Sequence, residues 1–186
     1  MKMVYQSQND LLLNKLMVFY NKNNNFIKML KIINGESKIS LRIVDWFSTN
    51  YAKKNFTTYE IDNNPRFKIY NDYKLKLKAY SKKRFDPFCR WDRIKVPFGD
   101  NEYSIETTIG QLNFFKWAIE NKIIDYIDTN YEIIENDMNN NNSISKAKKH
   151  NDSLTNNKSR KRREELSISA AKCLKKEKVD IVFKFN

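Results

Sequence analysis

The sequence predicts an α+β protein, mostly helical, with a small antiparallel sheet that includes a C-terminal hairpin. Three observations predict this class. Apolar residues recur at helical spacing through much of residues 1–138, whereas RIKVPF reads as a strand and VDIVFKF alternates with a period of two. The 12 Phe, 10 Tyr and 3 Trp among 186 residues supply enough apolar surface to offset the entropy of ordering one domain.

Three parts follow along the chain. Residues 1–138 form the helical-rich core domain, and residues 139–160, which include the low-complexity run NNNNSISKAKKHNDSLTNNKS, form a disordered Asn/Lys-rich linker. Residues 161–186 form a C-terminal β-hairpin in which KKEK is the turn. Because an isolated hairpin is marginal in water, we expect it to dock on the core.

The first half of the core is read as helices and an irregular stretch. Residues 10–33 predict two short helices joined by the Asn-rich turn NKNNN, and Gly35 ends the second. Ser37 or Ser40 can cap the next helix, SLRIVDWFSTNYAKK, on which Ile43, Phe47 and Tyr51 share a face. Residues 56–70 are extended and irregular, since Pro65 forbids a continuous helix.

The second half begins with DYKLKLKAYSKKR, which Asn71 or Asp72 can cap as a helix, although KLKLK also alternates as a strand would. Asp86-Pro87 marks a break, and the strand RIKVPF is followed by a GDN turn. Helices are expected near 109–120, 122–128 and 130–138, with Thr108 and Thr129 at capping-box spacing. The apolar face of the first comprises Leu112, Phe115, Trp117, Ala118 and Ile119.

Charge is polarised along the chain, whose net charge is +13. Residues 66–96 carry 11 Lys and Arg against 3 acids, whereas residues 97–138 carry 2 against 9. Clustered cations raise the local concentration of polyanions such as DNA or RNA. A solvated face, or an intramolecular match between the two blocks, explains the same pattern without a ligand.

The stretch YSKKRFDPFCRWDRIKVPF mixes six cations with five rings, which predicts stacking of unpaired bases beside phosphate-binding cations. A second basic run, KSRKRREE, is a nucleic-acid patch, a nuclear-localisation-like signal or a solubilising run. The Phe residues of the first stretch are better explained by the core. The candidate nucleic-acid-binding residues are Tyr73, Lys74, Lys76, Lys78, Tyr80, Lys82, Lys83, Arg84, Arg90, Trp91, Arg93, Lys158, Arg160, Lys161, Arg162 and Arg163.

No catalytic residue, metal site or cofactor is predicted. His150 lies in the expected linker, Cys89 has no visible base, and 3 Gly leave no room for a phosphate-binding loop. A magnesium-dependent nuclease using Asp62 and Asp72 with Lys74 is a weaker alternative. The two unpaired Cys residues and the absence of a long apolar run indicate a soluble protein of a reducing compartment without a membrane role.

Four stretches carry a resemblance to a known family: VDWFSTNYAKK, LKAYSKKRFDPFCR, TTIGQLNFFKWAIENKIIDYI and ELSISAAK. Together they resemble uncharacterised proteins of the nucleocytoplasmic large DNA viruses, the giant, mimivirus-like viruses of amoebae, over about residues 40–138 and 160–186. The family pattern has a basic–acidic pair after FDPFCR, where this chain has Trp91-Asp92. The resemblance implies a viral protein made in an infected host cell, and it implies no activity.

The sequence therefore favours a non-enzymatic DNA- or RNA-binding protein of a large DNA virus, acting in replication, transcription or genome packaging. We expect it in the cytoplasm, viral factory or nucleus of the infected cell. The alternative is a structural or scaffold protein of the virion. In either case the acidic block 97–138 offers a surface for a viral protein partner.

Overall fold

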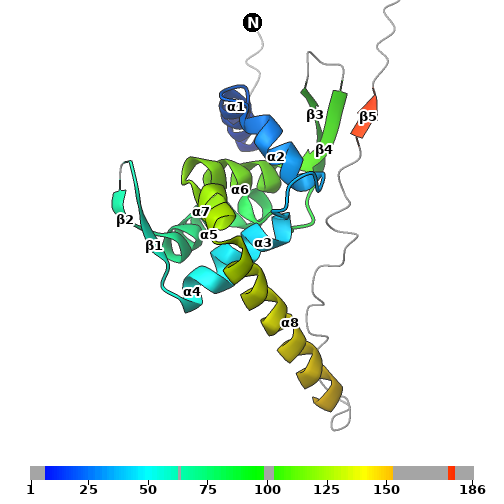
Figure 1. The fold of residues 1–186 in the computed structure, drawn as a ribbon. Coiled ribbons are helices and arrows are strands. Elements are labelled where there is room, and N and C mark those ends of the chain that lie inside the picture. Colours follow the sequence, from blue (N-terminus) through cyan, green and yellow to red (C-terminus); the bar gives the residue numbers. More distant parts are fainter. Residues whose placement is uncertain (1–6, 63, 99–102, 153–175, 179–186) are drawn as a thin grey trace, which may run out of the picture.

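The computed structural model describes residues 7–62, 64–98, 103–152 and 176–178. It has the mostly helical α+β architecture that the sequence predicts, and α6 contacts α1, α2, α5, α7 and β4 (Figure 1). The elements are α1 Gln8–Tyr20, α2 Asn25–Ile33, α3 Leu41–Trp46, the π-helix η1 Phe47–Tyr51, α4 Ala52–Lys54, β1 Thr58–Ile61, β2 Asn64–Lys68, α5 Ile69–Phe85, β3 Arg93–Phe98, β4 Tyr103–Thr108, α6 Ile109–Glu120, α7 Ile123–Thr129, α8 Tyr131–Asp152 and β5 Lys176–Lys178.

The helices α1 and α2 confirm the predicted pair and its Asn-rich turn. Ser7 and Asp10 form a capping box at the start of α1, in which each side chain accepts a hydrogen bond from the other residue's backbone N–H. Asn23 and Asn24 adopt left-handed backbone with φ of 52° and 55°. Asparagine tolerates this conformation better than most residues, which explains how a chain poor in glycine reverses here.

The predicted helix SLRIVDWFSTNYAKK forms, but its middle is a π-helix. Ser40 caps it by accepting a hydrogen bond from the Ile43 N–H, as expected. The Ser48 and Thr49 hydroxyls donate back to the carbonyls four residues earlier, at 2.8 Å and 2.7 Å. Such back-bonding bends helices, and π-helical turns are frequent at functional sites.

A β-hairpin, β1 and β2, lies within residues 56–70, which the sequence predicts to be extended and irregular. Tyr59 pairs with Phe67 across the hairpin, and the Tyr59 ring stacks on Tyr126 with centroids 5.1 Å apart. Tyr59 also donates its hydroxyl to the Asn121 carbonyl. These tertiary contacts anchor a two-stranded sheet that would be marginal alone.

The second sheet has the strand order β3-β4-β5 and is antiparallel. RIKVPF is strand β3, as predicted, and its Val96 pairs with the buried Ile105 of β4. The prediction that KKEK forms a turn is wrong for residues 176–178, because they pair with β4 as a strand. The rest of the predicted hairpin, 161–175 and 179–186, lies outside the described residues.

The helix α6 has the predicted bounds and is buried over most of its circumference. Thr108 accepts a hydrogen bond from the Gln111 N–H and so caps it. Its Phe114 and Phe115 are fully buried alongside Leu112, and Phe114 packs edge-on against Phe85 of α5. A helix that is buried on nearly all sides forms the centre of the core.

The helix α8 extends further than predicted. The prediction of a disordered linker from residue 139 is wrong for 139–152, which continue α8, while 153–160 lie outside the described residues. The Asn141 amide and the Ser143 hydroxyl donate to carbonyls four residues earlier, and adding residues to an existing helix needs no new nucleus. Thr129 belongs to α7 and does not cap α8. None of the described helices is long and apolar enough to span a membrane.

Gly110, near the start of α6, lies against the backbone that ends α5. A Cβ at this position would stand 2.9 Å from the Asp86 carbonyl oxygen and 3.1 Å from that of Lys83. We expect Gly110→Ala to lower the free energy of unfolding by about 3 kcal/mol, because backbone atoms must shift. Urea denaturation followed by circular dichroism measures the loss.

Gly35→Ala is the matched control, since nothing lies within 4 Å of a Cβ there and only its φ of +74° opposes the change. Its loss should be about 1 kcal/mol. A Gly110→Ala variant as stable as Gly35→Ala would contradict the close packing.

Candidate nucleic-acid interface

The solvent side of α5 presents three lysines of the predicted site. Lys74 and Lys78 are exposed and stand four residues apart, so they share one face of the helix. Lys82 is exposed one turn later, beyond a kink. Within the described part of the chain, no carboxylate pairs with these three residues, which we call the α5 lysines. Their charge is therefore available to an external anion.

The kink in α5 lies at Ser81, whose φ of 66° and ψ of 164° are not helical. The turn that follows it is held from the core side. Asn113 of α6 donates to the Arg84 carbonyl at 2.9 Å, and Gly110 allows α6 to approach the carbonyls of Lys83 and Asp86 closely. Packing against α6 thus supports a backbone conformation that serine rarely adopts.

The cations after the kink have different surroundings. The Lys83 ammonium lies 3.8 Å from the centre of the Trp91 ring, a close cation–π contact. Arg84 is half-buried and donates to Asn9 and Gln8 at the start of α1, which ties it to the fold. Among the other candidates, Arg90 is exposed, Lys76 and Trp91 are half-buried, and Arg93 is exposed and bonded to Glu106 at 3.3 Å.

Two predicted stacking rings face the protein. The prediction for Tyr73 is wrong, because this ring is 7% exposed and packs against Phe85 and Trp117. Burial raises the pKa of the Tyr73 hydroxyl, and the nearby Asp45 and Asp86 carboxylates add to the effect. Tyr80 is half-buried and stacks on Phe85 with centroids 6.1 Å apart. A ring at 73 placed on α5 beside lysines looked exposed from sequence, yet it lies on the core side of the helix.

The ion pairs described for the acidic block 97–138 are made with cations from elements other than α5. Asp128 bonds to Lys38 at 3.0 Å and Asp137 to Lys54 at 2.6 Å, while Glu120 pairs within α6. Glu106 forms an ion pair with Arg93, which belongs to the predicted site. The α5 lysines are therefore not matched internally by the described acids. The second predicted cluster, Lys158, Arg160, Lys161, Arg162 and Arg163, lies outside the described residues.

The acids proposed for a nuclease have structural partners. Asp72 accepts a hydrogen bond from the Trp117 indole at 2.6 Å, and the exposed Asp62 pairs with Lys122 at 2.7 Å. In the described ranges, no three His, Cys, Asp or Glu side chains are grouped to hold a metal ion. Asp72 thus has a clear role in fixing α6 against α5.

Sequence reasoning missed a group of residues beside the α5 lysines. Lys53, Lys68 and Tyr70 come from α4, β2 and the start of α5, and they line a pocket. Lys74 approaches the same Tyr70 ring, 5.9 Å from its centre. No local pattern marks these residues, because the hairpin and the π-helix bring them together.

Comparison with known proteins places the chain in a family. The model of a family of unknown function (DUF7197) matches residues 2–185. The chain belongs to this family. Because the function of this family is unknown, membership assigns no activity to the chain. The resemblance described from the sequence likewise implies no activity. No solved structure matches the chain.

This DUF7197 chain is similar to a viral protein. It is 50% identical over 132 residues to the "Uncharacterized protein L507" of Acanthamoeba polyphaga mimivirus. The match covers 67% of this chain and 51% of the relative, so the chain spans about half the length of the curated relative that it matches. The predicted similarity to an uncharacterised giant-virus family is confirmed.

Asp45 should make the stability of this chain depend on pH. Burial, reinforced by the Asp86 carboxylate, raises the pKa of Asp45 from 3.8 to about 7. Between these values the folded protein holds a proton that the unfolded chain releases, so the free energy of unfolding falls by a few kcal/mol as the pH rises from 3.8 to about 7. Asp45→Asn should remove most of this fall and exceed the wild type in stability at pH 8, as measured by urea denaturation across pH.

The exposed Asp92 supplies the control for this change. Asp92→Asn should retain the wild-type decline. Equal declines in the wild type and Asp45→Asn would show that Asp45 is not the group responsible.

The bond between Asp72 and Trp117 gives a second test. Trp117 is 3% exposed, so Asp72→Ala leaves its indole N–H without an acceptor and should lower the free energy of unfolding by about 1 to 3 kcal/mol. Asp72→Asn retains an acceptor oxygen and should lose less. Asp62→Ala, at an exposed ion pair, should change stability little. If Asp62→Ala is the more damaging variant, the structural role assigned to Asp72 is wrong.

Proposed function

We propose that this protein binds nucleic acid through the α5 lysines and the cations that follow them, without catalysing a reaction on it. The observation that carries the proposal is the exposure of Lys74, Lys78 and Lys82 without a described carboxylate partner. A phosphate backbone satisfies several such ammonium groups at once and releases its counterions, which favours binding.

The spacing of Lys74 and Lys78 suits this ligand. Residues four apart on a helix rise about 6 Å, which is close to the separation of successive phosphates in an extended strand. Lys83 and Arg90 extend the exposed positive charge beyond the kink. Similarity to a viral protein makes replication, transcription or genome packaging in an infected cell the expected setting.

Fluorescence anisotropy with labelled DNA and RNA, single-stranded and duplex, tests the proposal at several salt concentrations. Replacing the α5 lysines together by Ala should weaken binding to every one of these ligands. If each lysine neutralises one phosphate, the slope of log affinity against log salt on duplex DNA should fall by about 0.9 per lysine.

A control with the same loss of charge uses three exposed lysines near α2, of which Lys22 precedes the helix and Lys28 and Lys31 lie in it. Their replacement by Ala should change the slope much less. Equal effects of the two triple variants would indicate a response to net charge alone. Absence of binding to all four ligands at low salt would overturn the proposal, and preferential binding of polyglutamate would indicate an acidic protein partner instead.

A further inference from the structure

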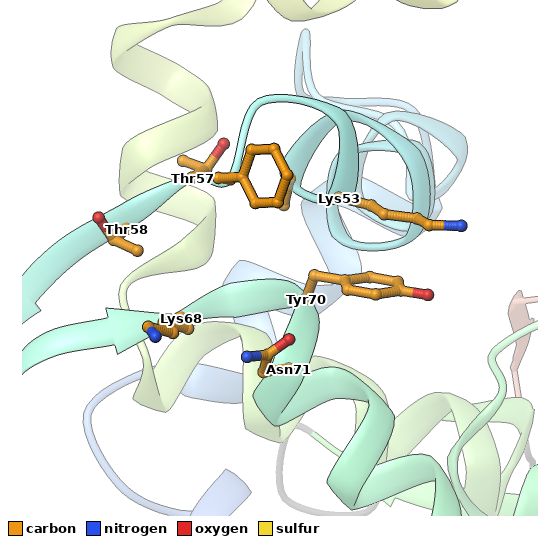
Figure 2. Close-up of a pocket in the computed structure, with 8 residues that line it drawn as sticks. Lys53, Thr57, Thr58, Lys68, Tyr70 and Asn71 are labelled. Atoms are coloured by element: carbon orange, nitrogen blue, oxygen red, sulfur yellow. The ribbon is translucent and has the colours of Figure 1, made fainter.

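A pocket of about 460 Å³ opens between α4, the β1–β2 hairpin and the start of α5. Figure 2 shows Lys53 and Thr57 on one side of it and Lys68, Tyr70 and Asn71 on the other. Its volume falls in the range of small-molecule sites. No carboxylate is among the described lining residues, and the two lysines make the pocket basic.

Phe56 is the first unusual feature of this pocket. Its side chain lines the pocket and is 86% exposed, and its backbone is left-handed with φ of 49°. The residue ends α4 in a Schellman turn, in which the Thr57 N–H bonds to the Ala52 carbonyl at 3.1 Å. Glycine or asparagine normally occupies such a position, because other residues are strained there. A strained phenylalanine that buries almost nothing contributes little to folding.

Tyr70 supplies a second ring, and it is surrounded by positive charge. The ammonium groups of Lys53 and Lys74 lie 5.7 Å and 5.9 Å from its centre. Lys68 is exposed at the pocket edge. The pocket therefore combines aromatic surface with lysines at short range, and an anionic aromatic ligand matches both.

Thr57 lines the pocket without offering its hydroxyl to a ligand. Its Oγ1 is buried and has no hydrogen-bond partner among the described residues. A buried hydroxyl without a partner is unfavourable, and because this atom exposes almost no surface, a ligand in the pocket does not reach it. The exposed Asn71 amide, on the opposite side of the pocket, offers a hydrogen-bonding group to a ligand.

We propose that this pocket binds an unpaired nucleotide, with the base against Phe56 and Tyr70 and the phosphate at Lys53 and Lys68. The inference rests on the proposed function where the nucleotide belongs to a strand, since Lys74, one of the α5 lysines, lies beside the Tyr70 ring of the pocket. A free mononucleotide presents the same chemistry. A duplex does not, because its bases are stacked and paired.

Phe56→Gly is the decisive variant, because it removes the ring and relieves the backbone strain. We expect its urea midpoint to rise while its affinity for a single-stranded deoxythymidine 12-mer carrying one 2-aminopurine falls about 5-fold to 150-fold. Quenching of 2-aminopurine fluorescence on stacking should be lost as well. Its affinity for a duplex of equal length should not change.

Two further variants are controls. Thr57→Val, which removes the unsatisfied and inaccessible hydroxyl at nearly constant shape, should leave single-strand binding unchanged without lowering stability. Ile133→Ala removes another exposed apolar side chain, 61% exposed on α8, and should leave binding unchanged.

Titration of the protein with 5′-adenosine monophosphate by calorimetry tests whether the pocket binds a free nucleotide.

The outcomes distinguish the pocket from the proposed function. In one outcome, the wild type binds the single strand without quenching 2-aminopurine, and Phe56→Gly binds it equally well. This outcome overturns the proposal for the pocket and leaves the proposal for the α5 lysines standing. In a second outcome, the wild type binds 5′-adenosine monophosphate but no strand, and Phe56→Gly abolishes this binding. This outcome supports a pocket for a free nucleotide and overturns the proposed function. If neither ligand binds the wild type, both are overturned.

Discussion

The close packing of α6 against the backbone at the end of α5 determines much of what this protein presents to solvent. Gly110 admits two carbonyls that a side chain would displace, and Asn113 binds a third. The non-helical backbone at Ser81 is thereby stabilised, and Lys82 and Lys83 project from a turn that would otherwise continue the helix. The buried aromatic rings around Phe85 reinforce the same junction.

The local sequence was sufficient to predict an element where residues at the element's own ends define its boundaries. The strand RIKVPF and the helix expected near 109–120 form with these bounds, and the Thr108 cap defines the start of the helix. The hairpin β1–β2 was missed, since Tyr59 is held by Tyr126 from a distant helix. The continuation of α8 past residue 139 was missed because composition argued for disorder, whereas an established helix adds residues easily.

The candidate site was predictable in its chemistry and not in its geometry. Counting charges along the sequence identified the α5 lysines, because a lysine on a helix surface is exposed without requiring particular neighbouring residues. The direction in which Tyr73 points depends on where α5 meets α6, and no pattern near residue 73 reveals it. The pocket required three elements to meet, and the left-handed backbone of Phe56 follows from the way α4 ends.

The π-helix η1 separates the length of one helix from the composition of the pocket. A π-helical turn contains more residues than an α-helical one, so the five residues of η1 turn the chain through about the same angle as four α-helical residues. A relative shortened by one residue between 47 and 51 would therefore form a regular α-helix there and keep Lys53 beside Tyr70. A single-residue deletion in α3 would instead turn Lys53 by about 100° around the helix axis and change the ligand environment.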